Sequence, residues 1–107
     1  MPERILSFSE AKTKLSQPFM HTVMGQVDDY CAYLSYFKGQ YRFHKHNKDE
    51  MYIVLEGEIC IEFDDSKSSL CLKEGDTLVV KAGEVHCSSS KDGALVLMFK
   101  AQDLFAE

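Results

Sequence analysis

The feature that most constrains this chain is a long series of short apolar runs that begins at Phe19 and ends at Lys100. The runs are rich in Val, Ile, Leu, Tyr and Phe, and turn residues such as Gly, Asp and Asn separate them. Many short strands at such spacing are typical of an all-β sandwich or barrel. No helical pattern long enough for a crossover separates the runs, so the sheets should be mainly antiparallel. The predicted strands are 19–24, 30–37, 41–46, 50–56, 58–63, 69–72, 77–81, 85–90 and 94–100.

One short helical segment is expected ahead of these strands. Residues 8–15 are the only helix-like stretch; Ser9 can cap it, and Pro18 ends any continuation. The 107 residues have room for one domain, and 45% of them are apolar, which is enough for a core without disulfides. We therefore predict a single all-β domain over residues 1–107, with a barrel at about 19–100 and an N-terminal helical turn.

Composition limits the classes of partner. The chain has a net charge of −5 and only two arginines, Arg4 and Arg42, whereas nucleic-acid binding starts from clustered Lys and Arg. No apolar run approaches the ~20 residues that a membrane helix needs. No apolar signal-peptide segment follows the first residues either. We expect neither a nucleic-acid nor a membrane partner.

The cysteines favour a reducing compartment. They are widely spaced, none forms a C-x-x-C pair, and each lies in an apolar or strand-like run. This distribution predicts free, buried thiols rather than a disulfide framework, and with them a cytoplasmic location. The four residues are Cys31, Cys60, Cys71 and Cys87.

The segment 39–50 holds a candidate metal site. His44 and His46 alternate on a predicted strand, so their side chains should project from the same face. Glu50 opens the next run, and an antiparallel return would bring its carboxylate beside the two imidazoles. Three such ligands suit Fe²⁺, Mn²⁺, Ni²⁺ or Zn²⁺. The alternative is a solvated pair of histidines at the polar end of a strand.

A third histidine, His86, at the start of another predicted strand, extends the pattern until it resembles that of the cupin family. The first cupin motif is a Gly, a spacer, H-x-H, three or four residues, a Glu, six residues and a Gly. The second is a Gly, five residues, P-x-G, two residues, a His and, after three more residues, an Asn. The matching positions are Gly39, His44, His46, Glu50 and Gly57 in the first motif and Gly75, Gly83 and His86 in the second. The departures are a first spacer of four residues instead of five, Lys81 in place of Pro and Ser90 in place of Asn.

The resemblance implies a conical, jelly-roll-like barrel with one divalent metal ion on His44, His46, Glu50 and His86. Such a ligand set leaves coordination positions for water, substrate or O₂, which marks a catalytic rather than a structural metal. It favours a small, oxygen-rich or anionic molecule as partner. The implied function is a metal-dependent oxygenase or isomerase. The alternative is a metal-centred module that binds or senses a small molecule without turnover, because the fold hosts many chemistries.

Two further residues are candidates for a catalytic role. Arg42 lies two residues before His44 and should point into the barrel, where its guanidinium would hold a substrate carboxylate or phosphate. The alternative for Arg42 is a rim position paired with a surface acid. Tyr52 shares the face of Glu50 and offers a hydroxyl as donor or proton relay. The alternative for Tyr52 is a ring packed in the barrel with its hydroxyl in water.

Three more polar residues share strands with the predicted site. His21 is more often a surface or supporting residue than a fifth ligand. Ser88 and Ser90 alternate with His86, so they would line a cavity or form a solvated strand end.

A homodimer is also expected. A barrel of this size leaves sheet edges and an apolar outer face, and a twofold dimer hides both. The candidate interface residues are Ile5, Leu6, Leu95, Leu97 and Phe99.

Overall fold

The computed structural model describes residues 4–64 and 69–102, and most of the regular structure within them is β-strand. The predicted domain covers residues 1–107, and its two ends, residues 1–3 and 103–107, lie outside the described residues. The elements are α1 (Phe8–Ala11), a 3₁₀ turn η1 (Lys12–Lys14), β1 (His21–Val27), β2 (Tyr30–Gln40), β3 (Glu50–Glu56), β4 (Glu58–Phe63), β5 (Ser69–Lys73), β6 (Thr77–Val80) and β7 (His86–Ala101).

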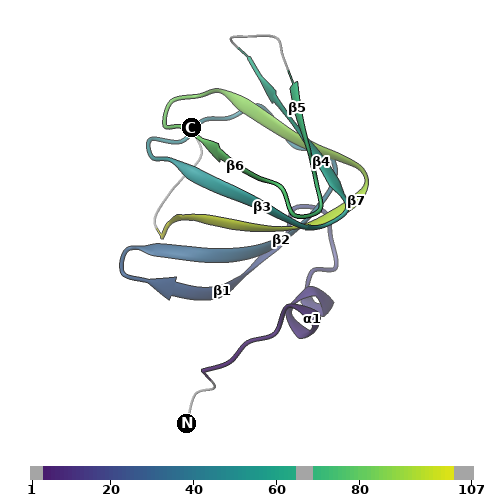
Figure 1. Ribbon diagram of the computed structural model, residues 1–107, viewed down its shortest axis with the longest axis vertical. Coiled ribbons are helices and arrows are strands. Elements are labelled where there is room, and N and C mark those ends of the chain that lie inside the picture. The colour runs from purple at the N-terminus through teal and green to yellow at the C-terminus, as the bar shows by residue number, and fades with distance from the viewer. Residues whose placement is uncertain (1–3, 65–68, 103–107) are drawn as a thin grey trace.

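The long strand β7 organises the barrel. Its C-terminal half pairs with β2 on one side and β3 on the other, while its N-terminal residues pair with β4. The sheet order is β1-β2-β7-β3-β6, and β5 pairs with β4. Figure 1 shows β7 running from the layer of β2 and β3 to that of β4 and β5. Every pairing of these strands is antiparallel, which confirms the predicted all-β antiparallel class.

Alternating side chains of the strands fill the barrel. Tyr52 and Val54 of β3 point inward, as do Ile59 and Ile61 of β4, and all four are at most 2% exposed. Alternation of this kind is what a strand with one buried face requires. Burial of one such aliphatic side chain stabilises the fold by roughly 1.5–3 kcal/mol.

The N-terminal helical turn covers part of the outside of the barrel. Ala11 and Leu15 pack against Leu34 of β2 and Leu95 of β7. Leu95 is therefore only 6% exposed, so its assignment to a dimer interface was wrong: the chain's own helical turn covers it. Ile5 is 84% exposed and stays in the predicted interface.

Two local predictions need correction. Ser7, not Ser9, caps the helix, because its Oγ accepts a hydrogen bond of 3.1 Å from the backbone N–H of Glu10. The segment 41–46 is not a regular strand; it makes only an isolated bridge, at His44. The expected alternation of side chains therefore does not hold along this segment.

The predicted strands 85–90 and 94–100 form one continuous strand, β7. The Asp92-Gly93 pair between them was expected to end a strand. Gly93 has a φ of +97°, a backbone conformation that glycine adopts without steric cost, so the strand bends there and continues.

The cysteine prediction is half wrong. Cys60 and Cys71 form a disulfide, because they lie directly opposite each other in the β4–β5 pair. Cys31 and Cys87 are free and buried, as predicted. Disulfides are rare in reducing compartments, so the cysteines do not support the predicted cytoplasmic location.

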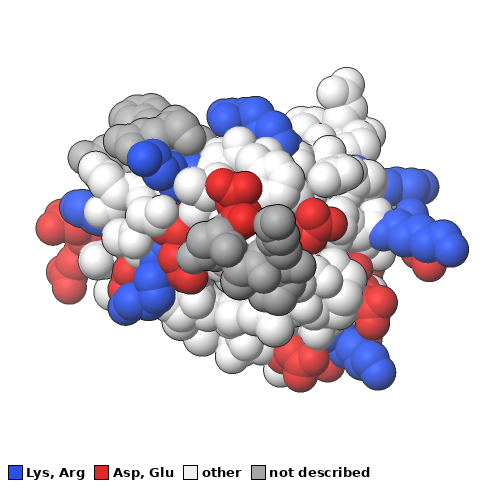
Figure 2. All heavy atoms as spheres, turned by 90° about the horizontal axis from the view of Figure 1, so that it is seen from above, with Lys and Arg blue, Asp and Glu red and all other residues white. Residues whose placement is uncertain are grey.

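The surface carries charges of both signs. Figure 2 shows Lys and Arg side chains interspersed with Asp and Glu over the face seen from above. In the described part of the chain, no helix is long and apolar enough to cross a membrane.

Candidate metal centre

Backbone contacts to the start of β7 bring the predicted ligands together. The N–H groups of His44 and His86 each donate to the other's carbonyl, both at 2.9 Å. The N–H of Gly83 donates to the carbonyl of His46, also at 2.9 Å. Glu50 is the first residue of β3, which lies beside β7 in the sheet. The irregular segment is thus held in place at two points, and both of its histidines reach the same position.

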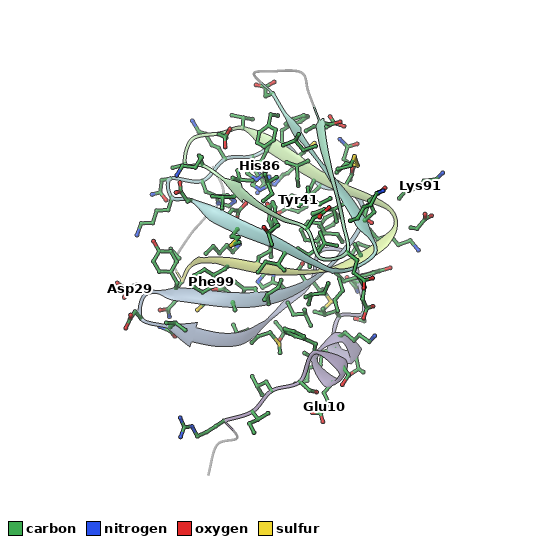
Figure 3. The ribbon with its side chains drawn as sticks, in the orientation of Figure 1. Glu10, Asp29, Tyr41, His86, Lys91 and Phe99 are labelled. Carbon is green, nitrogen blue, oxygen red and sulfur yellow. A yellow bond between two sulfur atoms is a disulfide. The ribbon has the colours of Figure 1, made fainter. Side chains whose placement is uncertain are left out.

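The four side chains form a compact buried group, called the His/Glu cluster below: His44, His46, Glu50 and His86. One ligand atom from each lies within 4.8 Å of the others. Oε1 of Glu50 is 3.2 Å from Nε2 of His86, and Oε2 is 3.5 Å from Nε2 of His46. The four residues are between 0% and 7% exposed. Figure 3 shows His86 inside the barrel.

Hydrogen bonds to backbone carbonyls fix how two of the imidazoles are presented. Nδ1 of His44 is 2.9 Å from the carbonyl oxygen of Arg42, and Nδ1 of His86 is 2.9 Å from that of Glu84. A carbonyl only accepts, so each Nδ1 carries the proton and donates it. In a neutral ring Nε2 then holds a free electron pair, and orientation of this kind is typical of metal-ligating histidines. The donor set of three imidazoles and one carboxylate fits a divalent transition metal.

The electrostatics of the cluster suit a cation. Burial alone raises the pKa of Glu50, but hydrogen bonds from His86 and Tyr52 outweigh it and lower that pKa to about 2. Burial lowers the pKa of His44. Burial also acts to lower the pKa of His86, but hydrogen bonds to Glu50 and to the Glu84 carbonyl raise it overall. At neutral pH the carboxylate is therefore anionic, and a metal ion that binds here displaces any proton on His86 Nε2.

Tyr52 lies beside the cluster, with its ring in the barrel core. Its hydroxyl donates to Oε1 of Glu50 at 2.6 Å and lies 3.3 Å from Nε2 of His86. Burial and the charge of Glu50 raise the pKa of Tyr52 well above its usual value. The hydroxyl therefore keeps its proton at neutral pH and orients the carboxylate.

A cavity of about 290 Å³ adjoins the cluster. Lys100 lines it, and sequence reasoning had assigned no role to this residue. The signal was present: Val96, Met98 and Lys100 alternate along β7, and the first two are buried. The cavity is lined by Phe19, His21, Ser35, Phe37, Tyr41, Arg42, His44, His46, Glu50, Tyr52, Ser88, Met98 and Lys100.

The other candidate residues divide between the cavity and the scaffold. Arg42 is exposed at the edge of the cavity, 5.5 Å from the ring centroid of Tyr41, which fits the alternative rim position and not the position inside the barrel. His21 lines the cavity but does not belong to the His/Glu cluster. Ser88 also lines it, whereas the Ser90 hydroxyl donates to the carbonyl of Glu58 at 2.7 Å and serves the scaffold.

Comparison with known proteins gives relatives in sequence and in structure. The chain is 41% identical over 68 residues to the uncharacterized protein YdbB of Bacillus subtilis, over 63% of this chain and 59% of that protein. It thus spans somewhat less than two thirds of that relative's length. A cupin-2 domain containing protein from Shewanella frigidimarina has a similar structure, with a TM-score of 0.85 and 24% identity over 92% of this chain and 95% of the other.

A second solved structure with this fold is the hydroquinone 1,2-dioxygenase PnpCD in complex with Cd²⁺ and 4-hydroxybenzonitrile. Its TM-score is 0.75 at 22% identity, covering 89% of this chain and 70% of that one. The Cupin_2 family model, described as a cupin domain, matches residues 38–99, which is more than half of the chain and contains the whole His/Glu cluster. The chain therefore belongs to the cupin family.

Proposed function

We propose that the protein binds one divalent metal ion on the His/Glu cluster and acts there, as a metal-dependent oxygenase or isomerase, on a small oxygen-rich or anionic molecule. The observation that carries the proposal is the convergence of three imidazoles and one carboxylate within 4.8 Å, next to a cavity of about 290 Å³. A structural metal site closes its coordination sphere with protein ligands, whereas a site that opens on a cavity leaves room for a substrate.

When bound, a divalent ion supplies Lewis-acid chemistry to the oxygen atoms of a substrate, and Fe²⁺, Mn²⁺, Ni²⁺ and Zn²⁺ all accept this ligand set. The chain's own residues do the rest. Glu50 offsets part of the positive charge, and Tyr52 holds Glu50 in position through its hydrogen bond. His21 provides an imidazole at the cavity, and because burial lowers its pKa it is neutral and can accept a proton at neutral pH.

The two candidate activities make different demands on the cavity. An isomerase moves protons on its substrate and needs a group that gives and takes them. Tyr52 is committed to Glu50 and its pKa is raised, which leaves His21 as the base among the described lining residues. An oxygenase takes its oxidant from O₂ and makes no such demand. The dioxygenase with the same fold gives this class of chemistry a precedent.

The proposal is tested by metal analysis and by turnover. Purified protein is stripped with a chelator, reloaded separately with Fe²⁺, Mn²⁺, Ni²⁺ or Zn²⁺, and given small carboxylates, diketones, phenols and sugars while O₂ is monitored. We expect about one ion per chain, and O₂ uptake only in the iron-loaded protein. Substrate turnover without O₂ uptake would assign the isomerase. Metal binding without turnover of any of these compounds would leave the non-catalytic binding module. Absence of metal binding would refute the proposal.

The role of Tyr52 gives a sharper expectation. Tyr52→Phe keeps the ring and removes the 2.6 Å hydrogen bond to Glu50. Loss of a group that orients a metal ligand lowers metal affinity roughly tenfold or more. Competition with a fluorescent chelator measures the change. Tyr30→Phe is the matched control, because Tyr30 is 41% exposed and stacks on Phe99, outside the cavity. Equal metal affinity in both variants would contradict the role given to Tyr52.

A further inference from the structure

We propose that the cavity binds an aromatic carboxylate, with Lys100 holding the carboxylate group and a row of aromatic side chains holding the ring. This inference rests on the proposed function, because the metal ion on the His/Glu cluster would form one wall of the cavity.

Lys100 is placed beside the cluster by the register of β7 and β3. It lies directly opposite Glu50 in that pair, and such opposed side chains start about 5 Å apart on the same face. Lys100 is half-buried and lines the cavity. Its ammonium lies 5.4 Å from the ring centroid of Tyr33, and no Asp or Glu of residues 4–64 and 69–102 forms an ion pair with it. The charge of Lys100 acts on Glu50, the carboxylate opposite it in the β3–β7 pair. Once a metal ion takes up the charge of Glu50, the partly buried ammonium is left to hold an anionic ligand.

The charges around the cavity favour the same kind of ligand. Arg42 adds a second cation at the edge, and its guanidinium is also without a carboxylate partner among the described residues. The only acidic residue in the lining is Glu50, and its charge is directed to the histidines of the cluster. With a divalent ion bound, the cavity is therefore strongly positive, which attracts an anion and repels a cation.

A row of rings forms the wall that would hold the aromatic part. The ring centroids of Phe37 and Phe19 are 5.2 Å apart, those of Phe19 and Tyr41 5.0 Å, and those of Tyr41 and His44 5.2 Å. The row runs from the barrel core to a predicted metal ligand, and Figure 3 shows Tyr41 inside the barrel near His86. Flat rings pack well on such a wall at centroid distances of 4.5–7 Å. The cavity's 290 Å³ is about ten times the volume of a water molecule, which suits a one-ring compound.

The test uses Co²⁺-loaded protein and three probes: benzoate, the neutral isostere benzamide, and the non-aromatic cyclohexanecarboxylate. Binding is followed by titration calorimetry and by the Co²⁺ absorption spectrum. We expect benzoate to bind at least tenfold more tightly than either of the other probes. Lys100→Met should weaken benzoate binding roughly tenfold or more and leave benzamide binding unchanged, since it removes a charge-assisted contact. Lys100→Arg should restore benzoate binding.

Lys91→Met is the matched control, because Lys91 lies on the same strand, is exposed, and points away from the barrel in Figure 3. Metal content and melting temperature are measured for every variant. Failure of the wild-type protein to take up metal would refute the proposed function itself. Three outcomes at normal metal uptake would overturn the aromatic-carboxylate assignment alone. The first is that benzoate fails to bind, and the second is that it binds no more tightly than benzamide or cyclohexanecarboxylate. The third outcome is equal benzoate affinity in the Lys100→Met and Lys91→Met variants.

Discussion

Replacing His86 by alanine is expected to reduce the bound metal from about one ion per chain to a small fraction of that, with a loss of affinity of at least ~100-fold. His86 is fully buried, and its Nε2 lies 3.2 Å from Oε1 of Glu50 at the centre of the cluster. Its removal takes away one of the four predicted ligands. Among the described residues, no other His, Cys, Asp or Glu belongs to the His/Glu cluster and could take its place. Elemental analysis and chelator competition measure the effect.

The matched control for this variant is His21→Ala. His21 lines the same cavity but stands outside the His/Glu cluster, so metal content should stay at the wild-type level. A stability measurement separates loss of metal from loss of fold: at a metal concentration 100 times the Kd, binding stabilises the folded protein by ~2.7 kcal/mol. The wild-type and His21→Ala proteins should show that gain on metal addition and the His86→Ala protein should not. Wild-type metal affinity in His86→Ala would refute the assigned ligand set.

A second variant guards against a folding defect. Glu50→Gln has nearly the same shape as the native residue and removes only the charge. It should fold, keep the hydrogen bond from Tyr52, and still lose most of its metal, because an amide oxygen is a poor substitute for a carboxylate beside three imidazoles. If the Glu50→Gln and His86→Ala proteins both kept their full metal content, the ion would bind elsewhere.

The strands were predictable because their patterns depend on neighbours in the sequence. Tyr52 and Val54, or Ile59 and Ile61, alternate with more exposed residues, and this alternation is visible without any knowledge of partner strands. Spacing alone brought together His44, His46 and Glu50 of the His/Glu cluster, and the resemblance to cupins added His86. His44 and His46 do converge, but not because they alternate on a regular strand, as predicted. The bridge from His44 to His86 holds the segment 41–46 in place.

The features that were missed depend on register between strands far apart in the sequence. Alternation along the strand puts Lys100 on the same face as Val96 and Met98. Only the pairing of β7 with β3 brings it beside Glu50, however, and no local pattern reveals that pairing. Cys60 and Cys71 meet because the register of β4 and β5 places them opposite each other. Arg42 was placed inside the barrel by strand alternation, which fails where the chain is not a strand. Sequence patterns therefore located the residues of the His/Glu cluster but not the walls of the cavity around them.

Gly57, the last matched position of the first motif, is expected to be among the most sensitive residues for stability. It joins β3 to β4 with a φ of +82°, and a Cβ built there would lie 2.5 Å from the carbonyl oxygen of Gly93 and 3.0 Å from Cα of Ala94. Both are backbone atoms of β7, so the substitution cannot be relieved by turning a side chain. Gly57→Ala thus combines the cost of a left-handed backbone, about 1–2 kcal/mol, with displacement of the central strand, about 1–3 kcal/mol.

Gly75→Ala separates these two costs. Gly75 has a similar φ of +90°, but a Cβ there would meet nothing within 4 Å. We therefore expect Gly75→Ala to lower the free energy of unfolding by about 1–2 kcal/mol and Gly57→Ala by about 3 kcal/mol or more, measured by urea denaturation of the metal-free proteins. The difference between the variants measures the close approach of β7 to the β3–β4 turn. Equal losses would show that this approach does not constrain the turn, and that Gly57 is required for its backbone conformation only.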